Sequence, residues 1–162
     1  MTAALSILKD EHRSIAAVLK GLMSHVAQAR DGRVPADVHL AAAMLDYLQA
    51  YPERLHHPKE DEYLFRFLRR RTGEANAVLD QLQEQHTRGA QLLGELRRTL
   101  EACRTTGNFD AFDPALAAYA EFQWQHMRLE EEVVLPLAER HLTPQDWQAL
   151  DAAFQANREP GW

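Results

Sequence analysis

Apolar side chains recur along most of this chain at alternating spacings of three and four residues, the pattern of an α-helix that buries one face. The first of these seams consists of Leu5, Leu8, His12, Ile15, Leu19, Leu22 and Val26. A later one consists of Leu79, Leu82, His86, Gly89, Leu93, Leu96, Leu100 and Cys103. Helices with such seams pack against one another along their length, and no segment alternates as a strand does. The pattern predicts an all-α protein.

Turn signals divide the helical sequence into four long segments and a short one. Gly32 and Pro35 end the first segment, Gly73 ends the second, and residues 105–114 form the third turn. The second segment, from about Ala36 to Arg71, contains Pro52 and Pro58, which predict a kink or a break because proline cannot donate a backbone hydrogen bond. The fourth segment is expected to bury one face made of Leu116, Tyr119, Phe122, His126, Val133 and Leu137.

Thr143 followed by Pro144 is a helix start, and it predicts a short terminal helix to about Ala156 that packs through Trp147, Leu150 and Phe154. Short turns between long amphipathic helices favour an antiparallel up-down-up-down four-helix bundle with this short C-terminal helix. We expect a single domain over residues 1–162, with the core bundle at about 5–141 and the terminal helix at about 144–156.

Composition excludes several classes of partner. The net charge of -6 argues against nucleic acid and against an anionic membrane surface. The sequence has no run of about 18 apolar residues, so no membrane span is predicted. The single cysteine, Cys103, excludes an intramolecular disulfide, is expected to be a buried apolar residue, and favours a cytoplasmic location.

Histidines interrupt the apolar seams at positions that are expected to face the core, where a polar side chain is unusual. His12 and His86 each occupy a seam position, while His56 with Glu60 and His126 with Glu130 repeat a His-x-x-x-Glu spacing. Residues four apart lie on one face of a helix, so an imidazole and a carboxylate at this spacing can converge on one ion. A single pair of this kind is common on solvated helix faces, but two pairs in long helices are harder to explain in that way.

Positions along the chain place these side chains at one height in an antiparallel bundle, because equal arms on either side of a turn reach equal heights. His12 and His56 lie at nearly equal separations before and after the first turn near Arg33. Glu60 and His86 lie at equal separations before and after Gly73. His86 and Glu130 do the same around Asn108, and His126 lies one helical turn nearer to it. At about 1.5 Å per residue, all six fall within roughly one helical turn of a common layer.

Four histidines and two glutamates in an apolar interior are costly unless a partner compensates them. Metal ions would satisfy all of them, and six ligands exceed the four typical of zinc, which favours two ions. Imidazoles with glutamates that can bridge suit iron, with manganese as the alternative. We therefore expect the metal ligands to be His12, His56, Glu60, His86, His126 and Glu130.

Spacing leaves other interpretations open. His12 and His86 could be hydrogen-bonded core histidines, and His57 with Asp61 is a rival pair shifted by one residue that could replace His56 and Glu60. Otherwise we expect surface or local structural roles for His25, His39, His57 and His141, and a solvated face for Glu131 and Glu132.

The chain resembles the hemerythrin-like, or HHE cation-binding, domain over about Leu5 to His141. The resemblance lies in LKDEHRSI, HHPKEDEYLF, QEQHTRGAQLL and HMRLEEEVVLP. It favours His56 with Glu60 over the shifted pair, because Leu64 and Phe65 fall where the family has Leu-Phe. Oxygen-carrying hemerythrins have a second histidine and an aspartate where this chain has Ala90 and Glu130, so its pattern is closer to hemerythrin-like proteins of oxidative and nitrosative stress.

The resemblance implies a non-haem di-iron protein that binds or reacts with oxygen, peroxide or nitric oxide, with Glu60, Glu130 or both as bridges. The alternative is a non-catalytic oxygen or redox sensor or an iron-storage protein, with a separate protein partner that the sequence does not identify. A metal-free helical interaction module is the interpretation that remains if the histidine layer is a coincidence.

Overall fold

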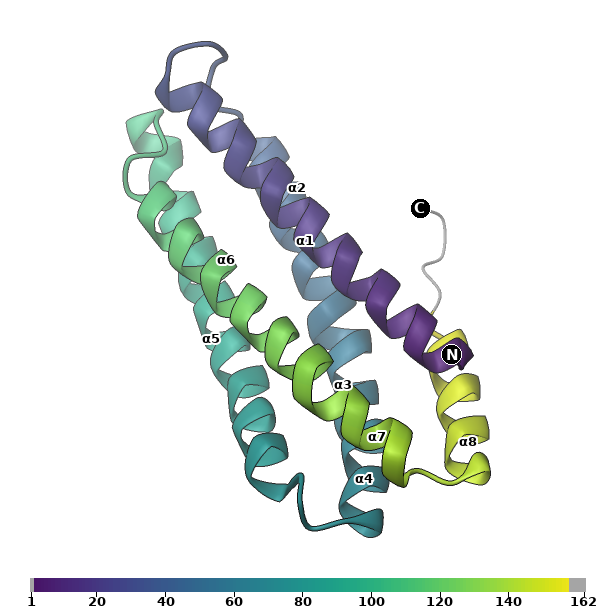
Figure 1. Cartoon of the computed structure of the whole chain (residues 1–162). Helices are drawn as coiled ribbons and strands as arrows, with labels where there is room; N and C mark the ends of the chain where they lie inside the picture. The colour runs from purple at the N-terminus through teal and green to yellow at the C-terminus, as the bar shows by residue number, and fades with distance from the viewer. Residues whose placement is uncertain (1, 158–162) are drawn as a thin grey trace.

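A computed structural model describes residues 2–157, and all regular structure in this range is helical, which confirms the all-α expectation (Figure 1). Four long helical segments lie side by side, and a shorter helix packs at one end of them. In chain order the elements are α1 (Ala3–Arg30), α2 (Val38–Leu48), η1 (Gln49–His56), α3 (His57–Lys59), η2 (Glu60–Phe65), α4 (Arg66–Arg71), α5 (Asn76–Thr106), α6 (Phe112–Leu129), η3 (Glu130–Val134), α7 (Leu135–His141) and α8 (Pro144–Gln155). Among the described helices, none is both long and apolar enough to cross a bilayer.

The two uninterrupted long helices follow their sequence patterns closely. Thr2 caps α1 by accepting a hydrogen bond from the backbone N–H of Leu5, and every residue of the predicted α1 seam is buried. The predicted α5 seam is buried throughout as well, and the Sγ–H of Cys103 donates to the carbonyl of Thr99 at 3.3 Å. Each helix is followed by a glycine with positive φ, Gly32 at 75° and Gly107 at 73°. Such a conformation suits glycine, which has no Cβ to clash.

The second long segment is interrupted where the two prolines occur. Pro52 lies inside η1 and Pro58 lies in α3, between the π-helical segments η1 and η2. A proline removes one backbone donor from the helical ladder, and a wider turn is one way in which a helix accommodates the missing bond. The expected break is confirmed. Its form, two π-helical stretches around one short α-helical turn, was not predicted.

The fourth long segment corrects one predicted core position. Val133 is 37% exposed, whereas Val134 is fully buried. Both lie in the π-helical segment η3, whose wider turn shifts the inward face by one residue compared with an α-helix. The prediction of Val133 as a core residue was therefore wrong. Phe122 on the same expected face is only half-buried.

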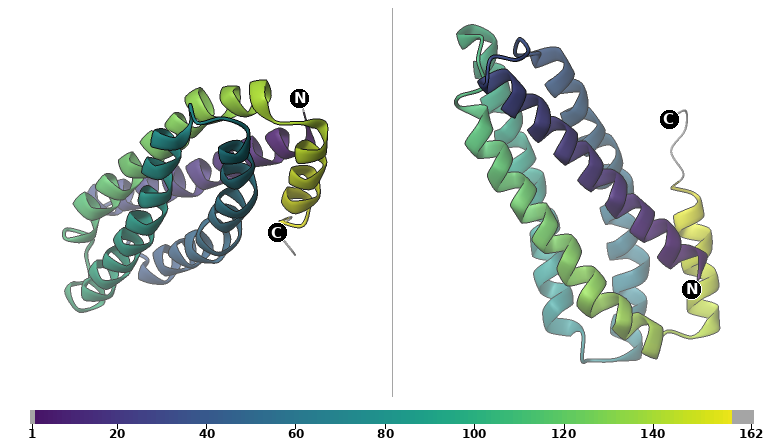
Figure 2. Two further views of the ribbon diagram at one scale, coloured as in Figure 1. Left: turned by 90° about the horizontal axis from the view of Figure 1, so that it is seen from below. Right: turned by 45° about the horizontal axis from the view of Figure 1, so that its top comes forward.

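Helix α8 covers one end of the bundle, beside the first turns of α1 (Figure 2). A capping box links Thr143 and Asp146 at its start, and Arg71 Nε donates to Asp146 at 2.8 Å. Arg71 and the cap hold the pKa of Asp146 down at about 2. The backbone N–H of Ala4 donates to Asp151 at 2.8 Å, and Leu150 is buried. These contacts attach α8 to α4 and α1 as the terminal-helix prediction required.

The apolar interior consists of two separate clusters. The first cluster includes Ile15, Leu19, Leu45, Leu96, Phe112 and Leu116. The second cluster includes Leu5, Phe65, Leu82, Val134 and Phe154. Along each long segment, the buried histidines and glutamates lie between residues of one cluster and residues of the other. A layer of polar side chains therefore crosses the bundle between two hydrocarbon cores.

Candidate metal centre

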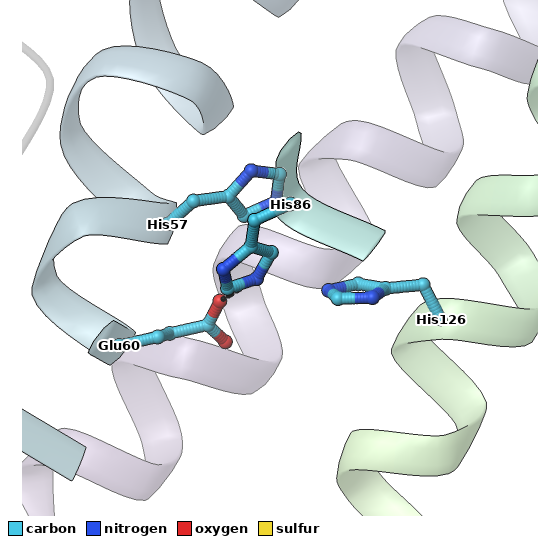
Figure 3. Close-up of side chains that lie close together, drawn as sticks. All are labelled: His57, Glu60, His86 and His126. Atoms are coloured by element: carbon cyan, nitrogen blue, oxygen red, sulfur yellow. Dashed lines mark ion pairs between the residues drawn. The ribbon is translucent and has the colours of Figure 1, made fainter. Parts of the chain in front are cut away.

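Two groups of four buried side chains make up this polar layer, and in each group the candidate ligand atoms lie within 4.8 Å of one another. Group A consists of His57, Glu60, His86 and His126. Group B consists of His12, His56, Glu60 and Glu130. In Figure 3 the group A side chains converge, with His57 and Glu60 coming from one long segment and His126 from the opposite side. All six ligands expected from the sequence are therefore brought together, and His57 joins them.

Glu60 belongs to both groups and lies between them. Its Oε2 is 3.1 Å from His56 Nε2 and 3.8 Å from His12 Nε2, both in group B. Its Oε1 is 3.2 Å from His86 Nε2 in group A, the ion pair drawn in Figure 3. The side chain is fully buried. One carboxylate thus directs one oxygen to each group.

His57 is the residue that the sequence analysis misplaced. Its side chain is 5% exposed and its ring stacks on that of His86, with centroids 4.1 Å apart, so the expectation of a surface position was wrong. Its place in group A makes it a further candidate ligand. Adjacent residues of a regular α-helix point about 100° apart, but η1 ends at His56 and α3 begins at His57, where the helical turn changes width. The sequence signal for this was the pair of adjacent histidines, His56 and His57, next to two prolines that interrupt the helix.

The rival pair His57 and Asp61 does not replace His56 and Glu60. The two residues have different positions. His57 is a member of group A, whereas Asp61 lies outside both groups and accepts a hydrogen bond from His86 Nδ1 at 3.0 Å. The second His-x-x-x-Glu pair divides as well. His126 lies in group A and Glu130 in group B, so these two side chains do not converge on one point.

The remaining histidines lie away from both groups. His39 is exposed, His25 Nε2 accepts a hydrogen bond from the backbone N–H of Asp37, and His141 pairs with Glu74. Ala90 is exposed as well and adds nothing to the layer.

Several buried ligand atoms have no hydrogen-bond partner among the described residues. They are Nε2 of His12, His86 and His126 and both carboxylate oxygens of Glu60 and Glu130. Burying such atoms without partners is costly, most of all for carboxylates. Cations at the two groups would satisfy them, and a mixture of imidazole and carboxylate donors suits iron and manganese. The residues present therefore fit a metal centre.

The histidines of group B are held in a strongly anionic environment. Burial alone would lower the pKa of His12, but the nearby carboxylates of Glu130, Glu131 and Glu60, at 3.3, 3.7 and 3.8 Å, raise it well above the ordinary value. Burial likewise opposes protonation of His56, yet Glu60 and Glu11 raise its pKa to about 9. Protons therefore compete with a metal ion for these two imidazoles.

Group A differs, because two of its three imidazoles resist protonation. Burial and the charge of His86 lower the pKa of His57, and the same two causes lower that of His126 to about 3. Only His86, against the effect of burial, has its pKa raised, to about 10, by Asp61 and Glu60. The carboxyls are also unequal. The pKa of Glu60 is lowered by the histidines around it despite its burial, whereas burial and the charge of Glu60 raise the pKa of Glu130 to about 8.

A surface pocket of about 330 Å³ reaches the edge of group B. It opens between α1 and the α6–η3 segment, with His12 in its wall beside Ala16, Trp124 and Met127. Glu131, expected on a solvated face, lies at the same place with Oε2 3.7 Å from His12 Nδ1. This pocket gives a small molecule an approach to His12 from solvent.

Comparison with known families gives one match over most of the chain. The family described as "Hemerythrin HHE cation binding domain" matches residues 3–138. A search of curated proteins found no significant match. The matched range begins with α1, extends into α7, and contains every member of groups A and B.

Proposed function

The chain belongs to the hemerythrin HHE cation-binding domain family, and from this premise we propose that it is a non-haem di-iron protein that binds or reacts with a small oxidant. In this proposal group A holds one iron and group B holds the other, with Glu60 as the bridge. Manganese is the alternative metal. The up-down-up-down order expected for the four long segments is part of the proposal, since it brings ligands from all of them to one height.

The position of Glu60 is the observation that carries the proposal. Its two oxygens face different groups of histidines at 3.1 and 3.2 Å, inside a layer where other buried ligand atoms lack partners among the described residues. A single cation would leave one of these groups uncompensated. Two neighbouring cations that share one carboxylate would compensate both.

The surroundings of the two groups favour small ligands over large substrates. Each group supplies four protein donors, fewer than octahedral coordination uses, which leaves room for a diatomic molecule or peroxide. The hydrocarbon cores on either side of the layer exclude bulk water, and the pocket at His12 provides an approach. Bound iron would supply the redox chemistry, while the protein side chains hold the metals and limit access to them.

Metal analysis with an absorption spectrum of protein purified from iron-supplemented cells is the first test. We expect about two irons per chain and near-ultraviolet charge-transfer absorption like that of an oxo-bridged ferric pair. A correctly folded protein that binds less than one metal per chain, even after reconstitution with iron or manganese, would contradict the proposal.

Incubation of the reduced protein with peroxide separates an enzyme from a sensor or storage protein. Repeated consumption of peroxide beyond the iron present would indicate catalysis. A single stoichiometric spectral change would indicate sensing or carriage, and uptake of iron well beyond two per chain would indicate storage. We propose oxygen, peroxide and nitric oxide as the ligands to compare, in the setting of oxidative or nitrosative stress.

A further inference from the structure

Glu11 is a buried carboxylate that belongs to neither metal group. It lies in α1, one residue before His12, and is 4% exposed. Its Oε1 is 2.5 Å from His56 Nδ1, and its Oε2 accepts a hydrogen bond from Tyr51 Oη at 2.6 Å. A carboxylate buried at this depth is expensive unless its charge serves a neighbour. Both of its oxygens are directed at polar groups of the second long segment.

The contact with Glu11 determines which nitrogen of His56 can bind a metal. Nδ1 of His56 donates to Glu11, so when the ring is neutral its free electron pair is on Nε2, the atom that lies 3.1 Å from Glu60. Carboxylates that accept from the outer nitrogen of a metal-binding histidine fix the ring and make it a stronger donor. Tyr51, 6% exposed, in turn holds Glu11 in place.

The corresponding contacts in group A place less negative charge directly on the rings. His57 Nδ1 lies 3.6 Å from Glu53 Oε1, beyond hydrogen-bond distance, and burial raises the pKa of this carboxyl to about 7.

The other two histidines of group A contact a neutral amide and a partly exposed carboxylate. His126 Nδ1 lies 2.7 Å from Oε1 of Gln85, a neutral amide. His86 Nδ1 lies 3.0 Å from Asp61, whose side chain is 35% exposed and therefore better screened by water. Group B also contains two carboxylates against one in group A. Negative charge is thus concentrated on one side of the shared Glu60.

We propose that Glu11, held by Tyr51, is a positioning residue that orients His56 and makes group B the more electron-rich of the two metal positions. This inference rests on the proposed di-iron function. Group B then binds a divalent metal more tightly than group A and stabilises the ferric state of its iron more strongly.

The Glu11→Gln variant tests this proposal, because it keeps the size of the side chain and an acceptor oxygen for His56 but removes the charge. Cobalt(II) binding, followed by its visible spectrum in competition with a chelator, measures the two affinities without any turnover. We expect the tighter affinity to fall by about 10–100-fold in Glu11→Gln and by less in Tyr51→Phe. Glu62→Gln, which changes an exposed glutamate two residues from Glu60, is the matched control and should leave both affinities unchanged.

The iron-loaded proteins give a second readout that a purely structural role of Glu11 would not change. Loss of the buried charge should raise the midpoint potential of Glu11→Gln relative to wild type and to Glu62→Gln. Unchanged cobalt affinities and potential in a folded Glu11→Gln variant would overturn the inference, even if the metal-free protein became less stable. A wild-type protein that binds no metal would instead overturn the di-iron function on which the inference rests.

Discussion

Group A offers three imidazoles and one carboxylate, whereas group B offers two of each. The outer contacts of the histidines differ in the same sense. Group A has a neutral amide, a partly exposed aspartate and Glu53 beyond hydrogen-bond distance, whereas group B has the buried Glu11 in direct contact with His56. Two of the group A histidines have lowered pKa values, while both group B histidines have raised ones. Two groups that share one carboxylate can therefore differ in charge and in histidine pKa values, because the side chains that they do not share differ.

Removal of Glu60 should have the largest effect, because it is the only described side chain that belongs to both groups. We expect Glu60→Ala to lose most of the metal of wild type, with roughly none retained after dialysis, since each ion loses its bridge. Metal analysis measures this loss, and circular dichroism checks the fold. Glu62→Ala is the control, and full metal content in Glu60→Ala would refute the shared-carboxylate arrangement.

Substitutions at two residues four apart on the fourth segment should each abolish metal binding at a different group. His126→Ala removes a ligand from group A and Glu130→Ala removes one from group B, so each variant should retain roughly half of the metal. Anomalous diffraction from crystals of the two variants would locate the remaining ion. If both variants kept it at the same position, the division of this pair between the groups would be wrong.

Truncation of His57 should weaken group A alone. The variant His57→Ala loses one of four donors, and its weaker metal affinity should drop by more than the roughly 10–100-fold typical of outer contacts. Cobalt(II) competition measures it. The control His25→Ala changes a histidine that accepts from the backbone of Asp37, away from both groups, and it should bind metal as wild type does. Equal metal affinities in these two variants would show that His57 is not a metal ligand.

The pH dependence of loading should be steeper for group B. His12 and His56 have raised pKa values, that of His56 about 9, and the pKa of Glu130 is about 8, so metal must displace protons from this group at neutral pH. Affinity for group B should therefore fall as pH decreases below about 9. In group A only His86 must lose a proton, because the lowered pKa values of His57 and His126 leave them neutral.

Single-site variants give the measurement for this pH effect. His126→Ala retains group B and Glu130→Ala retains group A, so their cobalt affinities can be followed separately between about pH 6 and 9. A smaller pH slope for the variant that retains group B would contradict the assignment of charge to the two groups.

The fold and most of the layer were predictable because α-helical periodicity holds over long stretches. Every predicted seam residue of α1 and α5 is buried, and counting from the turns brought six side chains to one height. What failed lies in or beside the π-helical segments. His57 and Val133 were misplaced because a wider turn changes which residues face inward, and an α-helical projection cannot anticipate this. Prolines signalled an interruption, but not the width of the turn that followed.

Glu11 shows a second limit of sequence reasoning. It stands beside His12 in a charged stretch, where spacing gives no reason to bury it. Its partners, Tyr51 and His56, are 40 and 45 residues away on another segment, so only the packing of two helices reveals the contact. Contacts behind a ligand depend on tertiary structure, whereas the ligands themselves follow helical periodicity.

The division of the apolar interior into two cores has a consequence for how the protein opens. Without metal, the layer between them contains buried carboxylate and imidazole atoms that lack hydrogen-bond partners among the described residues, and this weakens the middle of the bundle. Amide hydrogens near His56 and His86 should then exchange with deuterium sooner than those within either core, and metal should slow that exchange. The bound ions would link the helices at the level of the polar layer, so that the two apolar cores, which otherwise open independently, would open together.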